Sequence, residues 1–430
     1  IIKSQGGRGT CVSFSVAAAI EAAYRRSYGL VLDLSEQYIN HIQKMVWLEQ
    51  NLQNFDCREN QLGAWGGSSV EYEVELFKNY RIPLETYLPY ISGGDFQNTA
   101  QTGDNPYILW TNPCAAGTQK MVDDFNLSDQ PTAYNIPNPT TKTIFPLNAL
   151  ENAIYGIQSA VRAPSSSLQD TTWFETQLAA GREVMFGVAI CGSDPTPTNG
   201  VWNPGTGSPC EGHAMLMVGY NRPQRYFIVK NSWGCGSPAE GADGCFVRMS
   251  YDWVTNGYVN EAAYLQTVLP TTTDSSKQLF LGRWYLDHDG WQGLLDIYHL
   301  PGSCPLDLHG QTDRRLGTYF IQDGGIWVGR RVNGTITGNK IEFYIDWDTP
   351  NLDYGQLQGM KFTGYIFSWD RRYLAGTMLD DRDGKTYGFY GKKSEYLTGF
   401  PGASTPSLNA YVGNWRMNHD GWLGMLNITA

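Results

Sequence analysis

Charged residues are scarce in this chain. Asp, Glu, Lys and Arg make up 17% of its 430 residues, and acidic residues outnumber basic ones by 42 to 31, which gives a formal net charge of −11. A chain with this balance does not attract phosphate backbones or anionic headgroups, so we expect no nucleic-acid partner. Low charge combined with 48 glycines and 13% aromatic residues indicates a β-rich, turn-rich, extracellular protein.

Long hydrophobic runs are also lacking. Residues 184–190 form the longest apolar run, far short of the roughly 18 residues that a membrane span requires, so we expect no membrane span. The 41% hydrophobic content is still ample for packed cores, and 430 residues are enough for two or three domains. The chain begins at Ile1 without Met or a signal-like segment, so we expect a processed product or a fragment of a longer precursor.

No cysteine belongs to a CxxC pair, which excludes a zinc ribbon and a thioredoxin-like site, and we predict no metal and no other cofactor. The spacing of the eight cysteines instead suggests local disulfides, with three candidates: Cys191–Cys210, Cys235–Cys245 and Cys57–Cys114. Such bridges form in oxidising compartments, so we expect a secreted protein. With Cys11 free, an odd number remains, and Cys304 is the expected unpaired thiol.

A polar, breaker-rich stretch at 270–278 is the expected linker between two domains. Before it, an α+β domain is predicted over 1–269, with helices at 10–28, 35–47 and 70–80 followed by strands at 185–190, 214–220, 226–230 and 245–250. Within this domain, residues 92–170 are expected to be an irregular insertion or binding loop. After the linker, an all-β domain is predicted over 279–410, as an up-and-down barrel or a sandwich, with strands at 318–322, 326–332, 340–347, 361–369, 373–379 and 386–391.

The C-terminal part contains a repeat. Residues 281–297 align with 412–428 at an offset of 131, and nine of the 17 positions are identical. Each copy is predicted to be a hairpin with an Asp-Gly turn. Residues 411–430 are therefore interpreted as the start of a second copy of the β domain. The alternative is that the two copies are the first and last hairpins of one closed barrel.

The repeats also hold His-Asp pairs and tryptophans. A single His beside a turn Asp offers too few ligands for a metal, so we interpret His288 and His419 as structural. We interpret Trp284, Trp291, Trp415 and Trp422 as core or face aromatics rather than as a sugar-binding platform. The all-β domain loosely resembles avidin-type or lipocalin-type barrels, a likeness too general to name a ligand. It could bind an unknown ligand or a neighbouring chain.

Cys11 is the first candidate for chemistry, because it stands at the start of a predicted helix. Unpaired N–H groups and the helix dipole lower the pKa of a thiol there, and the thiolate is the nucleophile. Most cysteines at such positions are nevertheless only buried. His213 stands at the beginning of an apolar strand, and Asn231 follows the next strand and precedes Trp233. Cys, His and Asn in this order favour nucleophilic catalysis over separate structural roles.

These residues lie in motifs that resemble the papain-like cysteine peptidases. The likeness covers about residues 1–255, in order, and rests on Gln5-Gly-Gly-Arg-Gly-Thr-Cys11, Leu34-Ser-Glu-Gln37, Trp65-Gly-Gly-Ser68, Tyr87-Leu-Pro-Tyr90, Gly212-His213-Ala214 and Lys230-Asn-Ser-Trp-Gly234. The resemblance implies a two-lobed α+β fold, a peptide or protein substrate and, in a precursor, an inhibitory propeptide.

The resemblance also implies a role for each matching residue. Cys11 would be the nucleophile, His213 the general base and later the acid, and Asn231 the residue that orients the imidazole. The Gln5 side-chain amide and the Cys11 backbone N–H would form the oxyanion hole. Gly66 and Gly67 would bind the extended substrate backbone, and Trp233 would shield the His213–Asn231 hydrogen bond at the edge of the substrate site.

The chain also departs from the family pattern. Arg8 replaces a cysteine three residues before the nucleophile, and Ala64 replaces its usual disulfide partner. Ile42 and Val12 replace a further cysteine and a tryptophan. These changes bear on the rims of the cleft and on subsite preference rather than on the four catalytic positions.

We therefore predict a secreted cysteine endopeptidase with an accessory β domain for binding or assembly. One alternative is a peptide ligase or transpeptidase on the same fold, in which an amine intercepts the thioester. Another is a binding or scaffold protein whose peptidase site is vestigial, against which the presence of all four catalytic residues argues.

Overall fold

The structure of the chain is a computed structural model. It describes residues 2–40, 42–43, 68–90, 134–135, 149–150, 152–192, 197–205, 207–235, 245–270, 279–288, 290–297, 315–323, 326–346, 359–367, 371–393, 413–419 and 422–428. These residues form two compact units, which are described separately below.

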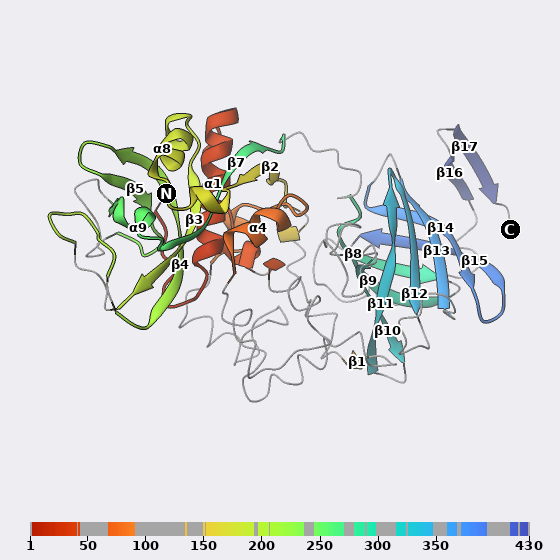
Figure 1. Cartoon of the computed structure of the whole chain (residues 1–430). Coiled ribbons are helices and arrows are strands. Elements are labelled where there is room, and N and C mark those ends of the chain that lie inside the picture. The colour runs from red at the N-terminus through yellow and green to blue at the C-terminus, as the bar shows by residue number, and fades with distance from the viewer. Residues whose placement is uncertain are drawn as a thin grey trace. The chain divides into compact units, whose positions relative to one another are not determined.

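The first unit is organised around helix α1 (Cys11–Tyr28), drawn in red in Figure 1. Its repeated alanines favour the helix, and Gly29 ends it in a left-handed conformation with φ 69°, which glycine adopts without strain. Every residue from Cys11 to Ile20 is buried, so α1 runs through the core of the unit. The predicted helix at 10–28 is confirmed to within one residue.

The remaining helices are short. Residues 36–40 and 42–43 are helical, within the helix predicted at 35–47. Helix α4 (Val70–Leu76) begins at Ser69, whose side chain accepts a hydrogen bond from the N–H of Tyr72, and it ends four residues before the predicted limit. The other helical elements are η2 (Glu85–Tyr87), η3 (Ser165–Ser167), α8 (Thr171–Ala179) and α9 (Asp252–Thr255).

A six-stranded antiparallel sheet completes the first unit, in the order β2-β7-β3-β4-β5-β6. Its strands are β2 (Ile157–Arg162), β3 (Val184–Cys191), β4 (Cys210–Asn221), β5 (Tyr226–Lys230), β6 (Phe246–Ser250) and β7 (Val259–Val268). The four predicted strands are confirmed. β2 and β7 were not predicted, and β2 lies inside the stretch 92–170 that was expected to be irregular. Helix α1 packs against β4, β3 and β7, so the predicted α+β class is confirmed (Figure 1).

The second unit is an eight-stranded barrel. Its strands are β8 (Gly282–His288), β9 (Trp291–Ile297), β10 (Arg315–Asp323), β11 (Ile326–Thr337), β12 (Lys340–Asp346), β13 (Gly359–Ile366), β14 (Tyr373–Asp380) and β15 (Lys385–Lys393). Each strand pairs antiparallel with its neighbour in sequence, and β15 pairs with β8 to close the ring. The barrel alternative is confirmed and the sandwich is wrong. Strand β1 (Tyr134–Asn135) adds to β11.

The barrel closes without the second copy of the repeat. β16 (Gly413–His419) and β17 (Trp422–Ile428) form a separate two-stranded sheet. The alternative that the two copies are the first and last hairpins of one barrel is therefore wrong. That residues 411–430 begin a second β domain remains a prediction.

Polar and aromatic side chains fill part of the barrel interior. His288 is fully buried, and its Nε2 lies 2.6 Å from the hydroxyl of Tyr319. Arg283 and Asp296 are both 1% exposed and form a two-point ion pair. Trp284 is buried, whereas Trp291 is 56% exposed. For Trp415, Trp422 and His419 the structure describes the strands that hold them and not their side chains. In the part of the chain that the structure describes, no helix has the length and apolar content to span a membrane.

Candidate active site

Cys11 is the first residue of α1 and is 9% exposed. The backbone N–H of Ala214 in β4 acts on its thiol and favours the ionised form. One turn further along α1, the Ser15 hydroxyl donates to the carbonyl of Met215 at 2.8 Å and ties the helix to β4. The fold thus brings Cys11 next to residues that are 200 positions away in sequence.

Cys11 is also the one free cysteine among the described residues. The predicted bridges Cys191–Cys210 and Cys235–Cys245 are both present. Cys191 and Cys210 face each other at the paired ends of β3 and β4. Cys57, Cys114 and Cys304 lie outside the described residues.

His213 and Asn231 come from neighbouring strands. His213 lies in β4, Asn231 directly follows β5, and these strands are paired. Nε2 of His213 lies 2.8 Å from Oδ1 of Asn231, and both side chains are buried. Oδ1 also accepts the backbone N–H of Ser232 at 2.8 Å.

This arrangement determines the tautomer of His213. Because a backbone N–H can only donate, the Asn231 atom bonded to it must be the oxygen, and that oxygen can bond only to a protonated Nε2. Nδ1 of the neutral ring then carries a lone pair. The imidazole is therefore set to accept a proton at Nδ1 while Asn231 holds Nε2.

Trp233 covers this pair. Its ring stacks on that of His213, with 4.8 Å between the centroids and 26° between the planes. The stacked indole limits rotation of the imidazole and keeps water from the hydrogen bond. In the described structure Trp233 thus contacts the histidine directly.

Gln5 reaches the site through the N-terminal segment. Its backbone N–H donates to the carbonyl of Ser232 at 2.8 Å. Its Oε1 accepts the Ser232 hydroxyl at 2.5 Å, and its Nε2 donates to the carbonyl of Arg8 at 2.6 Å. These bonds fix the orientation of the amide and use one of the two Nε2 hydrogens. The second hydrogen stays available for a further acceptor.

Burial dominates the ionisation of the two central groups. It raises the pKa of the Cys11 thiol, although backbone N–H groups of Ala214, Val12 and Cys11 offset part of the rise. Burial also lowers the pKa of His213 to about 4, against the effect of the bond to Asn231. The prediction that the helix start lowers the pKa of the Cys11 thiol is therefore wrong when His213 is left out of account. The cost of burying the thiolate outweighs the effect of the helix terminus.

Glu73 is a buried acid near Cys11 that sequence reasoning missed. It is fully buried on α4, and its Oε1 accepts the hydroxyl of Ser13 at 3.1 Å. Burial raises the pKa of Glu73 to about 8, and a negative charge there would raise the pKa of Cys11.

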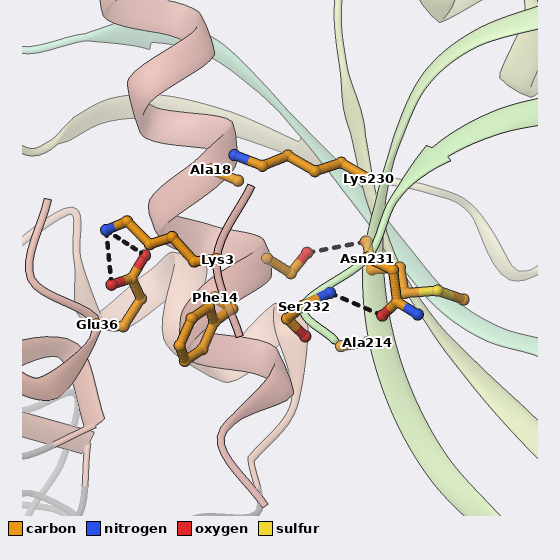
Figure 2. Close-up of a pocket in the computed structure, with 10 residues that line it drawn as sticks. Lys3, Phe14, Ala18, Glu36, Ala214, Lys230, Asn231 and Ser232 are labelled. Atoms are coloured by element: carbon orange, nitrogen blue, oxygen red, sulfur yellow. Dashed lines mark hydrogen bonds and ion pairs between the residues drawn. The ribbon is translucent and has the colours of Figure 1, made fainter. Parts of the chain in front are cut away.

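A small pocket lies beside Asn231 (Figure 2). It is lined by Lys3, Phe14, Ser15, Ala18, Glu36, Ala214, Met215, Lys230, Asn231 and Ser232. Nζ of Lys3 lies 2.7 Å from Asp33 and 2.8 Å from Glu36, and Nζ of Lys230 lies 3.7 Å from Glu21. The Lys3 ion pairs hold the N-terminal segment that carries Gln5, and the Lys230 pair joins β5 to α1.

The structure thus connects Gln5, Ser232, Asn231 and His213 through hydrogen bonds, and the backbone N–H of Ala214, next to His213 in the chain, acts on the Cys11 thiol. Gly66 and Gly67, the predicted substrate-binding glycines, lie outside the described residues. Ser232 and Arg8 also contact Gln5, although no role was predicted for either of them. Both lie inside the motifs that drew attention to the site, so their positions offered a signal. For Glu73 the signal is the helical spacing, which places it on the apolar face of α4.

No family model matches the chain. Among curated proteins, it is 26% identical over 250 residues to cysteine proteinase 3 of Solanum lycopersicum, covering 57% of this chain and 51% of that protein. It is also 26% identical over 259 residues to the oryzain gamma chain of Oryza sativa subsp. japonica, covering 60% and 50%. The chain therefore spans about half the length of these relatives.

Among solved structures, a Carica candamarcensis cysteine protease is 20% identical and superposes with a TM-score of 0.35, covering 62% of this chain and 92% of that one. Relatives of the chain among the curated proteins also include a thiol protease, aleurain, of Arabidopsis thaliana, at 24% identity over 54% of this chain and 48% of that protein. The resemblance to papain-like cysteine peptidases that the motifs predict is confirmed by these relatives.

Proposed function

We propose that the first unit is a cysteine endopeptidase that hydrolyses peptide bonds through a thioester intermediate. The observation that carries this proposal is the buried His213–Asn231 bond, which leaves Nδ1 of the histidine without a proton. Its similarity to proteins named cysteine proteinase and thiol protease supports the same activity.

Cys11 and His213 act as one unit in this mechanism. Burial disfavours a charge on either group alone. In the proposed mechanism the two groups ionise together, because opposite charges on neighbouring groups favour each other. Transfer of the thiol proton to Nδ1 gives a thiolate and an imidazolium together. The pair then titrates with pKa values that belong to both groups.

The reaction then has two steps. The Cys11 sulfur bonds to the scissile carbonyl carbon, and the carbonyl oxygen becomes an oxyanion within reach of the Cys11 N–H and the free hydrogen of Gln5 Nε2. Collapse of this intermediate breaks the C–N bond, and the imidazolium gives its proton to the leaving amine. Water, deprotonated by His213, hydrolyses the thioester and restores the thiol.

Hydrolysis of a peptide library by the wild-type chain, with products identified by mass spectrometry, tests this function. We expect new carboxyl and amino termini, and no products with the Cys11→Ala chain. Repeating the reaction with an added amine separates hydrolysis from ligation, because a ligase would give an amide of the amine as its main product. Wild-type protein that cleaves no peptide would contradict the proposal.

The barrel is proposed as an accessory domain for binding or assembly. Tyr365 and Tyr390 are each 43% exposed, and both pair in register with Ala375 on the strand between them. Two exposed rings flanking a small residue favour contact with another surface. Sedimentation of the wild type and of the Tyr365→Ala/Tyr390→Ala chain tests assembly. Equal sedimentation of the two chains would argue against a role of these tyrosines in assembly.

Secretion is likewise proposed, on the support of the two disulfides.

A further inference from the structure

The segment that joins Gln5 to Cys11 carries both proposed oxyanion donors but has no regular secondary structure. Three of its five intervening residues are glycines, and Gly6 has a φ of 58°. Glycine-rich segments are conformationally permissive, so ordering one is entropically costly. Contacts from outside the segment must therefore hold the Gln5 amide in one place.

Arg8, at the middle of this segment, supplies such contacts. It is 9% exposed, and its guanidinium donates to Oε1 of Gln37 at 2.7 Å and to Oδ1 of Asn40 at 3.1 Å. Gln37 and Asn40 are three residues apart in the helical stretch 36–40, so they present their oxygens on one face. The backbone carbonyl of Arg8 accepts Nε2 of Gln5. One residue thus anchors the segment and orients the amide.

Tyr90 holds the same segment at its two ends. Its hydroxyl donates to the carbonyl of Gln5 at 2.8 Å and lies 2.7 Å from the hydroxyl of Thr10. The guanidinium of Arg8 lies over the Tyr90 ring, 4.8 Å from its centroid. The ring in turn packs edge-on against Phe14, with centroids 4.8 Å apart. The arginine and the tyrosine therefore form one contact set around the segment.

We propose that Arg8, supported by Tyr90, is a positioning residue that holds the Gln5 amide where it can bind the oxyanion. This role rests on the proposed peptidase function. Arg8 does not touch the reacting atoms, and it acts through Gln5. The papain-like pattern has a disulfide-bonded cysteine at this position, and in this chain Arg8 and its polar contacts occupy it.

The expected effect is selective. Arg8→Met keeps the aliphatic stem and removes the donors to Gln37 and Asn40, so we expect kcat to fall about 10- to 100-fold with little change in KM. Arg8→Lys keeps the charge but cannot form the planar two-point contact, so its loss should be intermediate. Tyr90→Phe should also lower kcat, by a smaller factor than Arg8→Met. Arg25→Met, at an exposed position on α1, is the matched control and should leave kcat unchanged.

Two reagents distinguish positioning from general damage. A peptide aldehyde adds the Cys11 sulfur to its carbonyl carbon and places the resulting oxygen at the oxyanion site, whereas iodoacetamide alkylates sulfur and releases iodide without forming an oxyanion. For Arg8→Met we expect aldehyde affinity to fall in parallel with kcat, while the alkylation rate and the melting temperature stay near those of wild type. Parallel loss of alkylation would show that Arg8 is merely structural.

A double-mutant cycle decides whether Arg8 acts through Gln5. Gln5→Ala alone should cost about 100- to 1,000-fold in kcat. If Arg8 works by placing the Gln5 amide, Gln5→Ala/Arg8→Met should be no slower than Gln5→Ala. Additive losses, or an Arg8→Met chain as active as wild type, would overturn the positioning role alone. A wild-type chain that neither cleaves peptides nor binds the aldehyde would overturn the peptidase function together with it.

Discussion

Nε2 of His213 lies 2.8 Å from Oδ1 of Asn231, under the stacked ring of Trp233. Asn231→Ala removes the only described acceptor for that nitrogen and frees the ring to rotate. We expect kcat to fall by about 100-fold, because a small misplacement of a catalytic group has a cost of this order. Steady-state kinetics on a peptide substrate measure it. Asn79→Ala, at an exposed site in the same unit, is the control, and equal rates for the two variants would refute the orienting role.

The coupled ionisation of Cys11 and His213 predicts the pH dependence of alkylation. If the two groups share a proton as proposed, the wild type contains thiolate at pH 6, because the imidazolium accompanies it. In His213→Ala that partner is lost and burial raises the pKa of Cys11 against the backbone N–H groups, so we expect thiolate only above the ordinary range of about 8.5. We expect iodoacetamide to react at pH 6 at least about tenfold faster with the wild type. Superimposable pH profiles would show that the two groups do not share a proton.

Glu73 predicts how stability varies with pH. Burial raises its pKa to about 8 in the folded protein from 4.5, so the folded chain binds a proton that the unfolded chain releases between these values. The free energy of unfolding must then fall as pH rises from about 4.5 to about 8. Glu73→Gln keeps the shape and does not titrate. Its advantage over wild type should grow from near zero at pH 5 to about 2–5 kcal/mol at pH 8.5.

Urea unfolding of wild type and Glu73→Gln at several pH values measures this difference, and other titrating groups cancel between the two chains. Asn79→Ala, at an exposed site just beyond the same helix, changes no titrating group and is the control, so its difference from wild type should not vary with pH. A constant difference between wild type and Glu73→Gln across pH would mean that Glu73 is not protonated in the folded state.

The acidic residues of α4 also show where prediction from sequence stops. Glu71, Glu73 and Glu75 alternate with apolar residues in one short stretch, so they look equivalent. In a helix, however, Glu73 shares a face with Val70, Val74 and Phe77, whereas Glu71 and Glu75 lie four residues apart on another face. The side chains of Glu71 and Glu75 are 38% and 44% exposed, and Glu73 is fully buried, because α4 packs against α1 and β7. Helical spacing indicates which glutamate lies on the apolar face, and tertiary packing decides that it is fully buried.

Other features were readable because they are local. The barrel strands are short runs of β-forming residues separated by tight turns, a pattern that the sequence shows directly. Gly29 ends α1, as its position predicts. β2 was missed because it is an edge strand with a polar sequence, paired only with β7. The four candidate catalytic residues were identified from their motifs. The hydrogen bond between Gln5 and Ser232 spans 227 positions, so only the folded structure reveals it.

The disulfide between Cys191 and Cys210 ties the ends of two neighbouring strands. Cys191→Ala/Cys210→Ala should lower the free energy of unfolding by about 2–4 kcal/mol, since the bridge restricts the unfolded chain. Chemical denaturation under non-reducing conditions measures the loss, and a non-reducing digest of wild type should contain the bridged peptide. Unchanged stability together with free thiols at both positions would show that the bridge does not form.

The central claim, that Cys11 is the nucleophile, is tested most directly by one paired measurement. Wild type and Cys11→Ala are incubated with a peptide epoxide, the modified residue is mapped by mass spectrometry, and peptide hydrolysis is assayed on the same samples. We predict a single label on Cys11 that abolishes hydrolysis, and an unlabelled, inactive Cys11→Ala chain with an unchanged circular dichroism spectrum. Peptide hydrolysis by folded Cys11→Ala at the wild-type rate would contradict the account.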